Sequence, residues 1–234
     1  MARTRSVAFI SVFATLTVVL DTLPGLPQLS SGVWYHWVFV VAPLAGIALD
    51  PAESFLSVFL GVMIGHTVIL GDPYEYFFTL GAPLGAAVTS LVFRERTRAV
   101  LVYYVALLAA YLFSPAAGSL PLWALWDTFA AFVVLILVVL SRRKSYRLVN
   151  GRLALVFSTL IGLEADILFR VFLFVPLGTF DWLYGFSLDF MRDVWILSAF
   201  ISPIQVGIAM VSTFLVGTTI RTVTHSLTSK HSSC

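Results

Sequence analysis

The sequence predicts an all-α membrane protein, a polytopic transmembrane helical bundle of six to eight membrane segments with both termini in the cytoplasm. Of its 234 residues, 59% are hydrophobic and 11% are charged, whereas charged residues make up about 25% of an average soluble domain. Apolar runs long enough to cross a bilayer recur along the whole chain, and the connections between them are short. We therefore expect one transmembrane domain over residues 1–220 and a short polar cytoplasmic tail over residues 221–234.

Eight apolar segments are expected to be helical. Their approximate bounds are 6–22, 33–49, 52–70, 75–93, 99–113, 120–140, 153–176 and 193–218. A membrane-spanning helix needs about 20 residues, so the sequence leaves open whether residues 33–49 and 99–113 cross completely. Two arginines precede the first segment, but no small-residue cleavage site follows it, so we expect a retained helix rather than a signal peptide.

Local signals support the third and fourth segments. Pro51 suits the first turn of a helix, and Glu53 lies near the positive end of that helix's dipole. Both segments carry glycines spaced four residues apart, namely Gly61 and Gly65 in the third segment and Gly81 and Gly85 in the fourth. This spacing places two glycines on one helix face, which lets a neighbouring backbone approach closely.

The distribution of basic residues predicts the orientation. Of the 14 lysines and arginines, all except Arg170 and Arg192 fall on one side of an eight-span arrangement. By the positive-inside rule this side is cytoplasmic, which predicts a multi-pass protein of the plasma membrane. The tryptophans then lie at the outer ends of the segments, at Trp34, Trp37, Trp123, Trp126, Trp182 and Trp195. They form either an interfacial belt or the wall of an aromatic binding site.

The segment at residues 153–176 is apolar but contains Glu164, Asp166 and Arg170. A charge at membrane depth is costly unless it is paired or faces water, so these residues are functional candidates. Asp166 and Arg170 are four residues apart on one helix face and can pair, whereas Glu164 points elsewhere. Two interpretations remain. Either the pair neutralises itself and Glu164 bonds to a neighbouring helix, or the three residues form the polar wall of a ligand pocket.

Ionisable residues of other segments converge on the same outer zone and predict a water-accessible cavity that opens outward. His66 lies near the outer end of the third segment, and Asp127 lies about two turns inside the outer start of the sixth. The candidate substrate-binding residues are Trp34, Trp37, His66, Trp123, Asp127, Glu164, Asp166 and Arg170, with Trp126 as a further aromatic neighbour. The connection over residues 21–34 either covers this cavity as a lid or lies at the membrane interface.

Several kinds of chemistry lack their motifs. The Gly-x-x-x-x-Gly-Lys pattern is missing, so we do not expect the chain to hydrolyse ATP itself. The four histidines are scattered without a His-Glu-x-x-His pair, and the single cysteine, Cys234, excludes an internal disulfide or a cysteine metal cluster. No basic and aromatic surface for nucleic acid is evident. We therefore expect no enzyme activity, no cofactor and no metal site.

The stretch Pro43-Leu-Ala-Gly-Ile-Ala-Leu-Asp-Pro-Ala-Glu-Ser-Phe-Leu-Ser-Val-Phe-Leu-Gly-Val-Met-Ile-Gly-His66 resembles the second and third helices of S components. These are the substrate-capturing membrane subunits of energy-coupling factor (ECF) transporters, in which a Pro-Leu…Gly-Ile-x-x-x-Pro turn leads into a glycine-spaced helix. The run Ala8-Phe-Ile-Ser-Val-Phe-Ala-Thr-Leu16 and the last helix, which opens near Arg192 and closes with Arg221, are similar to archaeal members.

The resemblance implies a small all-helical protein that captures a vitamin, a related micronutrient or a metal from outside. It also implies docking on a transmembrane coupling subunit that carries two ABC-type ATPases. The chain departs from the family in two respects. The family usually has six helices, and its first helix often carries alanines spaced four apart, whereas Ala8, Ser11 and Ala14 are spaced three apart here.

Three functions are compatible with the sequence. The first is a substrate-binding subunit whose ligand is a small molecule enclosed by outer aromatic and polar residues, with Arg170 suited to a carboxylate or phosphate. The second is an intramembrane enzyme that uses Glu164 or Asp166 as an acid or base on a lipid-like substrate. The third is a membrane assembly factor in which the buried charges only hold helices together.

Overall fold

The computed structural model describes residues 2–23, 36–69, 73–143 and 151–229. Helices account for nearly all of these residues. In chain order they are α1 (Ala2–Thr22), α2 (Val38–Ala48), α3 (Pro51–Val68), η1 (Pro73–Phe78), α4 (Gly81–Phe93), α5 (Thr97–Leu112), η2 (Pro115–Ser119), η3 (Leu122–Leu125), α6 (Trp126–Arg143), α7 (Arg152–Phe174), α8 (Thr179–Trp182) and α9 (Leu188–Ser229). The elements η1 to η3 are 3₁₀ helices. The predicted all-α class is confirmed for the described residues.

Each of the eight expected segments coincides with a helix, although several bounds differ. The segment at residues 75–93 is divided into η1 and α4, and α9 continues for 42 residues, well beyond the expected end at residue 218. Most of the predicted polar tail is therefore helical. The two segments expected to be short are short, since α2 has 11 residues and α5 has 16.

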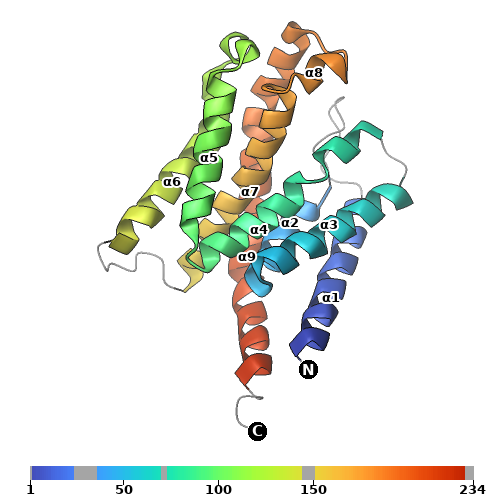
Figure 1. Ribbon diagram of the computed structural model, residues 1–234, viewed down its shortest axis with the longest axis vertical. Helices are drawn as coiled ribbons and strands as arrows, with labels where there is room; N and C mark the ends of the chain where they lie inside the picture. The colour runs from blue at the N-terminus through green and yellow to red at the C-terminus, as the bar shows by residue number, and fades with distance from the viewer. Residues whose placement is uncertain (1, 24–35, 70–72, 144–150, 230–234) are drawn as a thin grey trace.

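Four stretches of the described chain are long and apolar enough to cross a membrane. They are Pro51–Val68, Glu75–Phe93, Leu122–Ser141 and Leu188–Ile220. Helix α7 has 23 residues but carries three ionisable side chains in its interior, and it is not among these four. It is instead the most central helix, because it packs against α4, α9, α6 and α5. In Figure 1, α5 and α6 lie on one side of α7, and α1 and α3 lie on the other.

Small residues set the two closest helix contacts, as the glycine spacing predicts. A Cβ atom at Gly61 would collide with Thr17 of α1, and a Cβ atom at Gly65 would collide with Asp21 one turn further along α1. Gly81 and Gly85 of α4 face α7 in the same way. Each glycine pair therefore brings one helix against another, and each pair ends beside an aspartate.

Polar contacts hold the ends of the helices that lie near the start of α1. Ser6 of α1 donates a hydrogen bond of 2.6 Å to Glu53 of α3. Pro51 occupies the first turn of α3, as expected, and the preceding Asp50 forms an ion pair of 2.9 Å with Arg94 at the end of α4. Helix α1 begins and α9 ends toward the same end of the molecule, which is the lower end in Figure 1.

Candidate functional site: a polar cavity between α1, α3 and α7

A cavity lies between α1, α3, α4, α7 and α9. Its volume is about 720 Å³, counted to its open mouth. The lining residues are Asp21, His36, Val38, Phe39, Val62, His66, Glu75, Phe78, Thr79, Ala82, Leu163, Asp166, Ile167, Arg170, Gln205 and Val206. The wall is thus mainly apolar, with six ionisable side chains on it. Ligand pockets of proteins typically combine a mainly apolar wall with a few converging polar groups.

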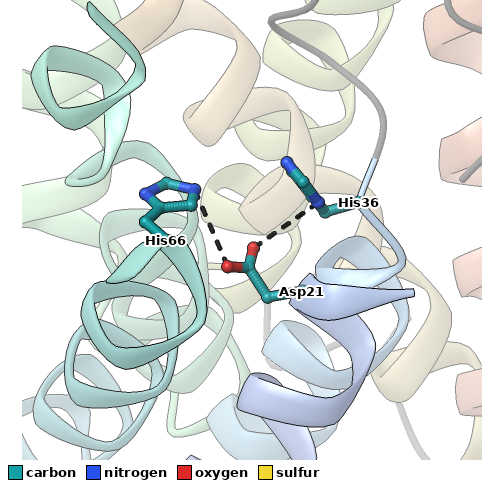
Figure 2. A group of neighbouring side chains, drawn as sticks. All are labelled: Asp21, His36 and His66. Atoms are coloured by element: carbon teal, nitrogen blue, oxygen red, sulfur yellow. Dashed lines mark ion pairs between the residues drawn. The ribbon is translucent and has the colours of Figure 1, made fainter. Parts of the chain in front are cut away.

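Four of the ionisable groups meet at one wall of the cavity. The two oxygens of Asp21 face one histidine each, and Figure 2 shows this carboxylate between the two rings. The Oδ1 atom of Asp21 lies 3.9 Å from Nδ1 of His36, and its Oδ2 atom lies 3.7 Å from Nε2 of His66. The Oε2 atom of Glu75 lies 3.8 Å from Nε2 of His36 and 3.9 Å from Nε2 of His66. These distances exceed those of hydrogen bonds.

Local backbone contacts explain why these residues meet. The N–H of Trp37 donates to the carbonyl of Leu20 at 3.2 Å, which holds the residues before α2 against the end of α1 and brings His36 beside Asp21. His66 lies in the last turn of α3, next to the notch that Gly65 leaves for the Asp21 carboxylate. Glu75 comes from η1, the short helix between α3 and α4.

The hydrogen bonds around His66 orient its ring. The hydroxyl of Thr79 lies 3.4 Å from Nδ1 of His66 and 3.5 Å from the carbonyl oxygen of Glu75. A hydroxyl that donates to this carbonyl accepts a hydrogen bond from Nδ1–H of His66. In the tautomer with the proton on Nδ1, the lone pair of Nε2 faces Asp21 and Glu75, whereas the other tautomer directs an N–H toward these carboxylates.

Burial differs among the four groups. The side chain of Asp21 is 2% exposed, and its Oδ2 atom is buried without a hydrogen-bond partner. The side chain of His36 is 32% exposed, so this wall of the cavity reaches the surface at His36.

Asp166 and Arg170 of α7 form another polar part of the wall. The predicted pair is confirmed, since Nε of Arg170 donates to Oδ1 of Asp166 at 2.7 Å. Gly81 of α4 leaves the space that the Asp166 carboxylate fills. Both interpretations of the segment therefore hold in part for these two residues, because they pair with each other and also line the cavity.

Glu164 and Asp127 lie outside this cavity. Glu164 is fully buried, and its Oε2 atom accepts a hydrogen bond of 2.9 Å from the Thr128 hydroxyl of α6. This matches the expectation that its carboxyl bonds to a neighbouring helix. Asp127 lines a second, more apolar cavity together with Phe174 and Trp195. The structure thus divides the predicted polar set between separate places.

The predicted aromatic residues that the structure describes, Trp37, Trp123 and Trp126, do not line the first cavity. Trp37 stacks on Phe39 with ring centroids 5.6 Å apart, and Phe39 is the residue that reaches the cavity. Trp123 is 54% exposed and packs against Phe200 of α9. Trp126 is also largely exposed, and its indole N–H donates to the carbonyl of Ala199. Trp34 and most of the possible lid over residues 21–34 lie outside the described residues.

Three ionisable residues of the cavity were not among the sequence-based candidates: Asp21, His36 and Glu75. The available signal was their position, because each lies at the end of an apolar segment on the side predicted to be outer. The spacing of these residues along the sequence did not predict that they form a cluster. The histidines that the sequence scatters are brought together by the contact of α1 with α3 and by the bond between Trp37 and Leu20.

The cavity is suited to a polar ligand with positive charge. Three carboxylates, those of Asp21, Glu75 and Asp166, and one guanidinium, that of Arg170, line it. Its formal charge is thus −2 when both imidazoles are neutral. Comparisons of the chain with protein-family models, with curated proteins and with solved structures find no match.

Proposed function

We propose that this chain is the membrane-embedded substrate-binding subunit of a micronutrient uptake transporter, and that it captures its ligand in the cavity lined by Asp21, His66 and Asp166. The observation that carries the proposal is the convergence of ionisable groups from α1, the start of α2, α3, η1 and α7 on one cavity. Such groups are costly in apolar helices and are retained there chiefly for function.

The proposed orientation places both termini in the cytoplasm and six to eight segments in the plasma membrane. The distribution of basic residues supports it. Asp21 and His66 lie in the last turns of α1 and α3, and His36 precedes α2, away from the end of the bundle where α1 begins. In this orientation the cavity opens in the outer half of the bilayer.

The proposed partner is a transmembrane coupling subunit with two ABC-type ATPases. Two observations from the sequence support it: the resemblance of residues 43–66 to S components and the lack of an ATP-binding motif in the chain. Binding without a coupled ATPase captures a ligand but does not accumulate it. We therefore expect uptake only when this chain is produced together with such partners.

A second candidate function is an intramembrane enzyme acting on a lipid-like substrate. The observation that favours it is the second cavity, where the Asp127 carboxyl lies among apolar side chains that include Phe174 and Trp195. A carboxyl in such surroundings is suited to proton transfer. This function requires turnover by the purified protein alone, and turnover must be lost in Asp127→Asn.

The proposal is tested by analysis of the small molecules and ions that co-purify with the protein in mild detergent. The wild type is compared with the double variant Asp166→Asn/Arg170→Gln, which alters the cavity wall without changing the net charge. Asp189→Asn, at an exposed residue of α9 outside this cavity, is the control. We expect a stoichiometric ligand in the wild type and the control, and its loss in the double variant. A folded wild type that carries only lipid, or a ligand retained equally in all three proteins, overturns the proposal.

A further inference from the structure

We infer that Asp21, His36 and His66 form a binding site for a divalent first-row transition-metal ion, and that this ion is the ligand captured by the cavity. The inference rests on the proposed function, because it names the substrate class of the same cavity. The chemistry of the site itself is argued from the geometry of these three side chains and their neighbours Glu75 and Thr79.

The donor atoms of the three side chains are close enough to share one ion. One ligand atom from each of Asp21, His36 and His66 lies within 4.8 Å of the other two. An ion held at ~2.0–2.2 Å by nitrogen and oxygen ligands separates neighbouring donor atoms by ~3.3 Å in a tetrahedral arrangement. Small rotations of the two rings close the difference. The Oε2 atom of Glu75 lies 3.8 Å from Nε2 of His36 and 3.9 Å from Nε2 of His66, and it adds negative charge beside the group.

The cluster contains a buried acceptor atom that has no hydrogen-bond partner. The Oδ2 atom of Asp21 is buried and accepts no hydrogen bond, although it belongs to a carboxylate that is almost wholly shielded from solvent. Its nearest ionisable neighbour, Nε2 of His66, lies 3.7 Å away, and an imidazole that carries its proton on Nδ1, beside the Thr79 hydroxyl, points the lone pair of Nε2 toward it. Two electron pairs that face each other repel, and a cation between them converts the repulsion into two coordinate bonds.

Residues next to the three proposed ligands hold these ligands in position. A histidine that binds a metal usually donates its other ring N–H to an oxygen atom, which fixes the tautomer and the ring orientation. Thr79 supplies such an oxygen at Nδ1 of His66. Gly65 contributes in another way, because any side chain at that position would displace the Asp21 carboxylate.

Charge and ligand type select the class of ion. The formal charge of −2 on the cavity matches one divalent cation. Two imidazole nitrogens favour Zn²⁺, Ni²⁺, Co²⁺ or Fe²⁺ over Mg²⁺ and Ca²⁺, which prefer oxygen ligands alone. The described cluster contains no thiolate or thioether, the ligands that select Cu⁺. The exposed edge of His36 gives the ion a route from the surface.

The test is a calorimetric titration of detergent-solubilised protein, first stripped with a chelator, with Co²⁺, Ni²⁺ and Zn²⁺. The protein carries no histidine tag, and His225 and His231 are replaced by alanine to remove the other two histidines. Within this background His66→Ala, His36→Ala and Asp21→Asn are compared with the control Asp189→Asn, at an exposed residue of α9. Thermal unfolding checks that every variant is folded.

We expect one ion per chain. Affinity should fall at least 100-fold in either histidine variant and at least 10-fold in Asp21→Asn, remain unchanged in the control, and show no competition from Mg²⁺ or Ca²⁺. The visible absorption of bound Co²⁺ provides a second readout, which should change in the histidine variants. Absence of saturable binding in folded protein, or binding that survives both histidine substitutions, overturns the inference.

The failures of the inference and of the proposed function are distinguishable. If no transition metal binds but an organic ligand co-purifies and is lost in Asp166→Asn/Arg170→Gln, the metal inference fails and the proposed function stands. Suppose instead that the metal binds as expected but cells with a coupling subunit and its ATPases do not accumulate it. The metal site is then confirmed, and the proposal that the ion is the captured substrate is overturned.

Discussion

At the scale of single residues, the two aspartates of the cavity are positioned in the same way, each beside a glycine of a neighbouring helix. Asp21 fills the space left by Gly65 of α3, and Asp166 fills the space left by Gly81 of α4. A carboxylate that packs against a neighbouring backbone in this way has few side-chain conformations available. What differs is its partner, because Asp166 is paired with Arg170 whereas Asp21 faces two histidines. This difference makes Asp21 the more available ligand.

Thr79 is expected to position His66 for metal binding. Thr79→Val removes the hydroxyl that accepts from Nδ1–H of His66 and should weaken binding of Co²⁺ about 10-fold, in line with other residues that orient metal ligands. Thr79→Ser keeps the hydroxyl and should restore most of the affinity. Titration of both variants checks this, and equal loss in the serine and valine variants would show that packing, not the hydrogen bond, matters at this position.

Thr128 is expected to stabilise the fold without affecting the cavity. Its hydroxyl donates to the fully buried Glu164, so Thr128→Val leaves that carboxyl without this donor and should lower the free energy of unfolding by about 1 kcal/mol. Thr128→Ser retains the donor and serves as the control. Thermal unfolding in detergent measures the effect. Metal or ligand affinity that fell together with stability would contradict the separation of Glu164 from the cavity.

At the scale of elements, the contact between α1 and α3 determines whether the site exists. The spacing of Gly61 and Gly65 predicted a close approach of some helix, and the structure confirms it. The sequence did not identify α1 as the partner, because helical periodicity describes one helix at a time. The rule that side chains two residues apart face apart also succeeded, since Glu164 and Asp166 point to different neighbours.

Gly65→Ala is expected to abolish the metal site through this contact. The added methyl group would occupy the position of the Asp21 carboxylate, so metal affinity should fall at least 10-fold. Gly207→Ala on α9 is the matched control, because a Cβ atom there meets nothing within 4 Å. Calorimetry and thermal unfolding are performed on both variants. Full affinity in Gly65→Ala would mean that Asp21 does not contribute a ligand.

At the scale of the whole molecule, the sequence predicted the helices better than it predicted the contacts between them. Apolar length identified every long helix, and the i, i+4 spacing identified the pair of Asp166 and Arg170. The aromatic residues were predicted to surround the ligand, yet Trp37, Trp123 and Trp126 face other partners. Position at the outer end of a helix does not specify which way a side chain points, and this explains why the cavity wall was only partly foreseen.

The single cysteine offers a direct test of the proposed topology. In intact cells, a membrane-impermeant thiol reagent should leave Cys234 unmodified, and permeabilisation should expose it, because the C-terminus is proposed to be cytoplasmic. The double variant Cys234→Ser/Ser119→Cys moves the thiol to η2, where residue 119 is exposed and proposed to face outward. It should be labelled without permeabilisation. Labelling of Cys234 in intact cells contradicts the orientation.

The central claim, that the cavity captures a transition-metal ion from outside, is tested most directly with sealed membrane vesicles of known orientation. Binding of radioactive Co²⁺ is measured on right-side-out and inside-out vesicles that contain either the wild type or His66→Ala. The account predicts saturable binding to right-side-out vesicles alone, and its loss in His66→Ala. Binding confined to inside-out vesicles, or binding that does not depend on His66, would contradict it.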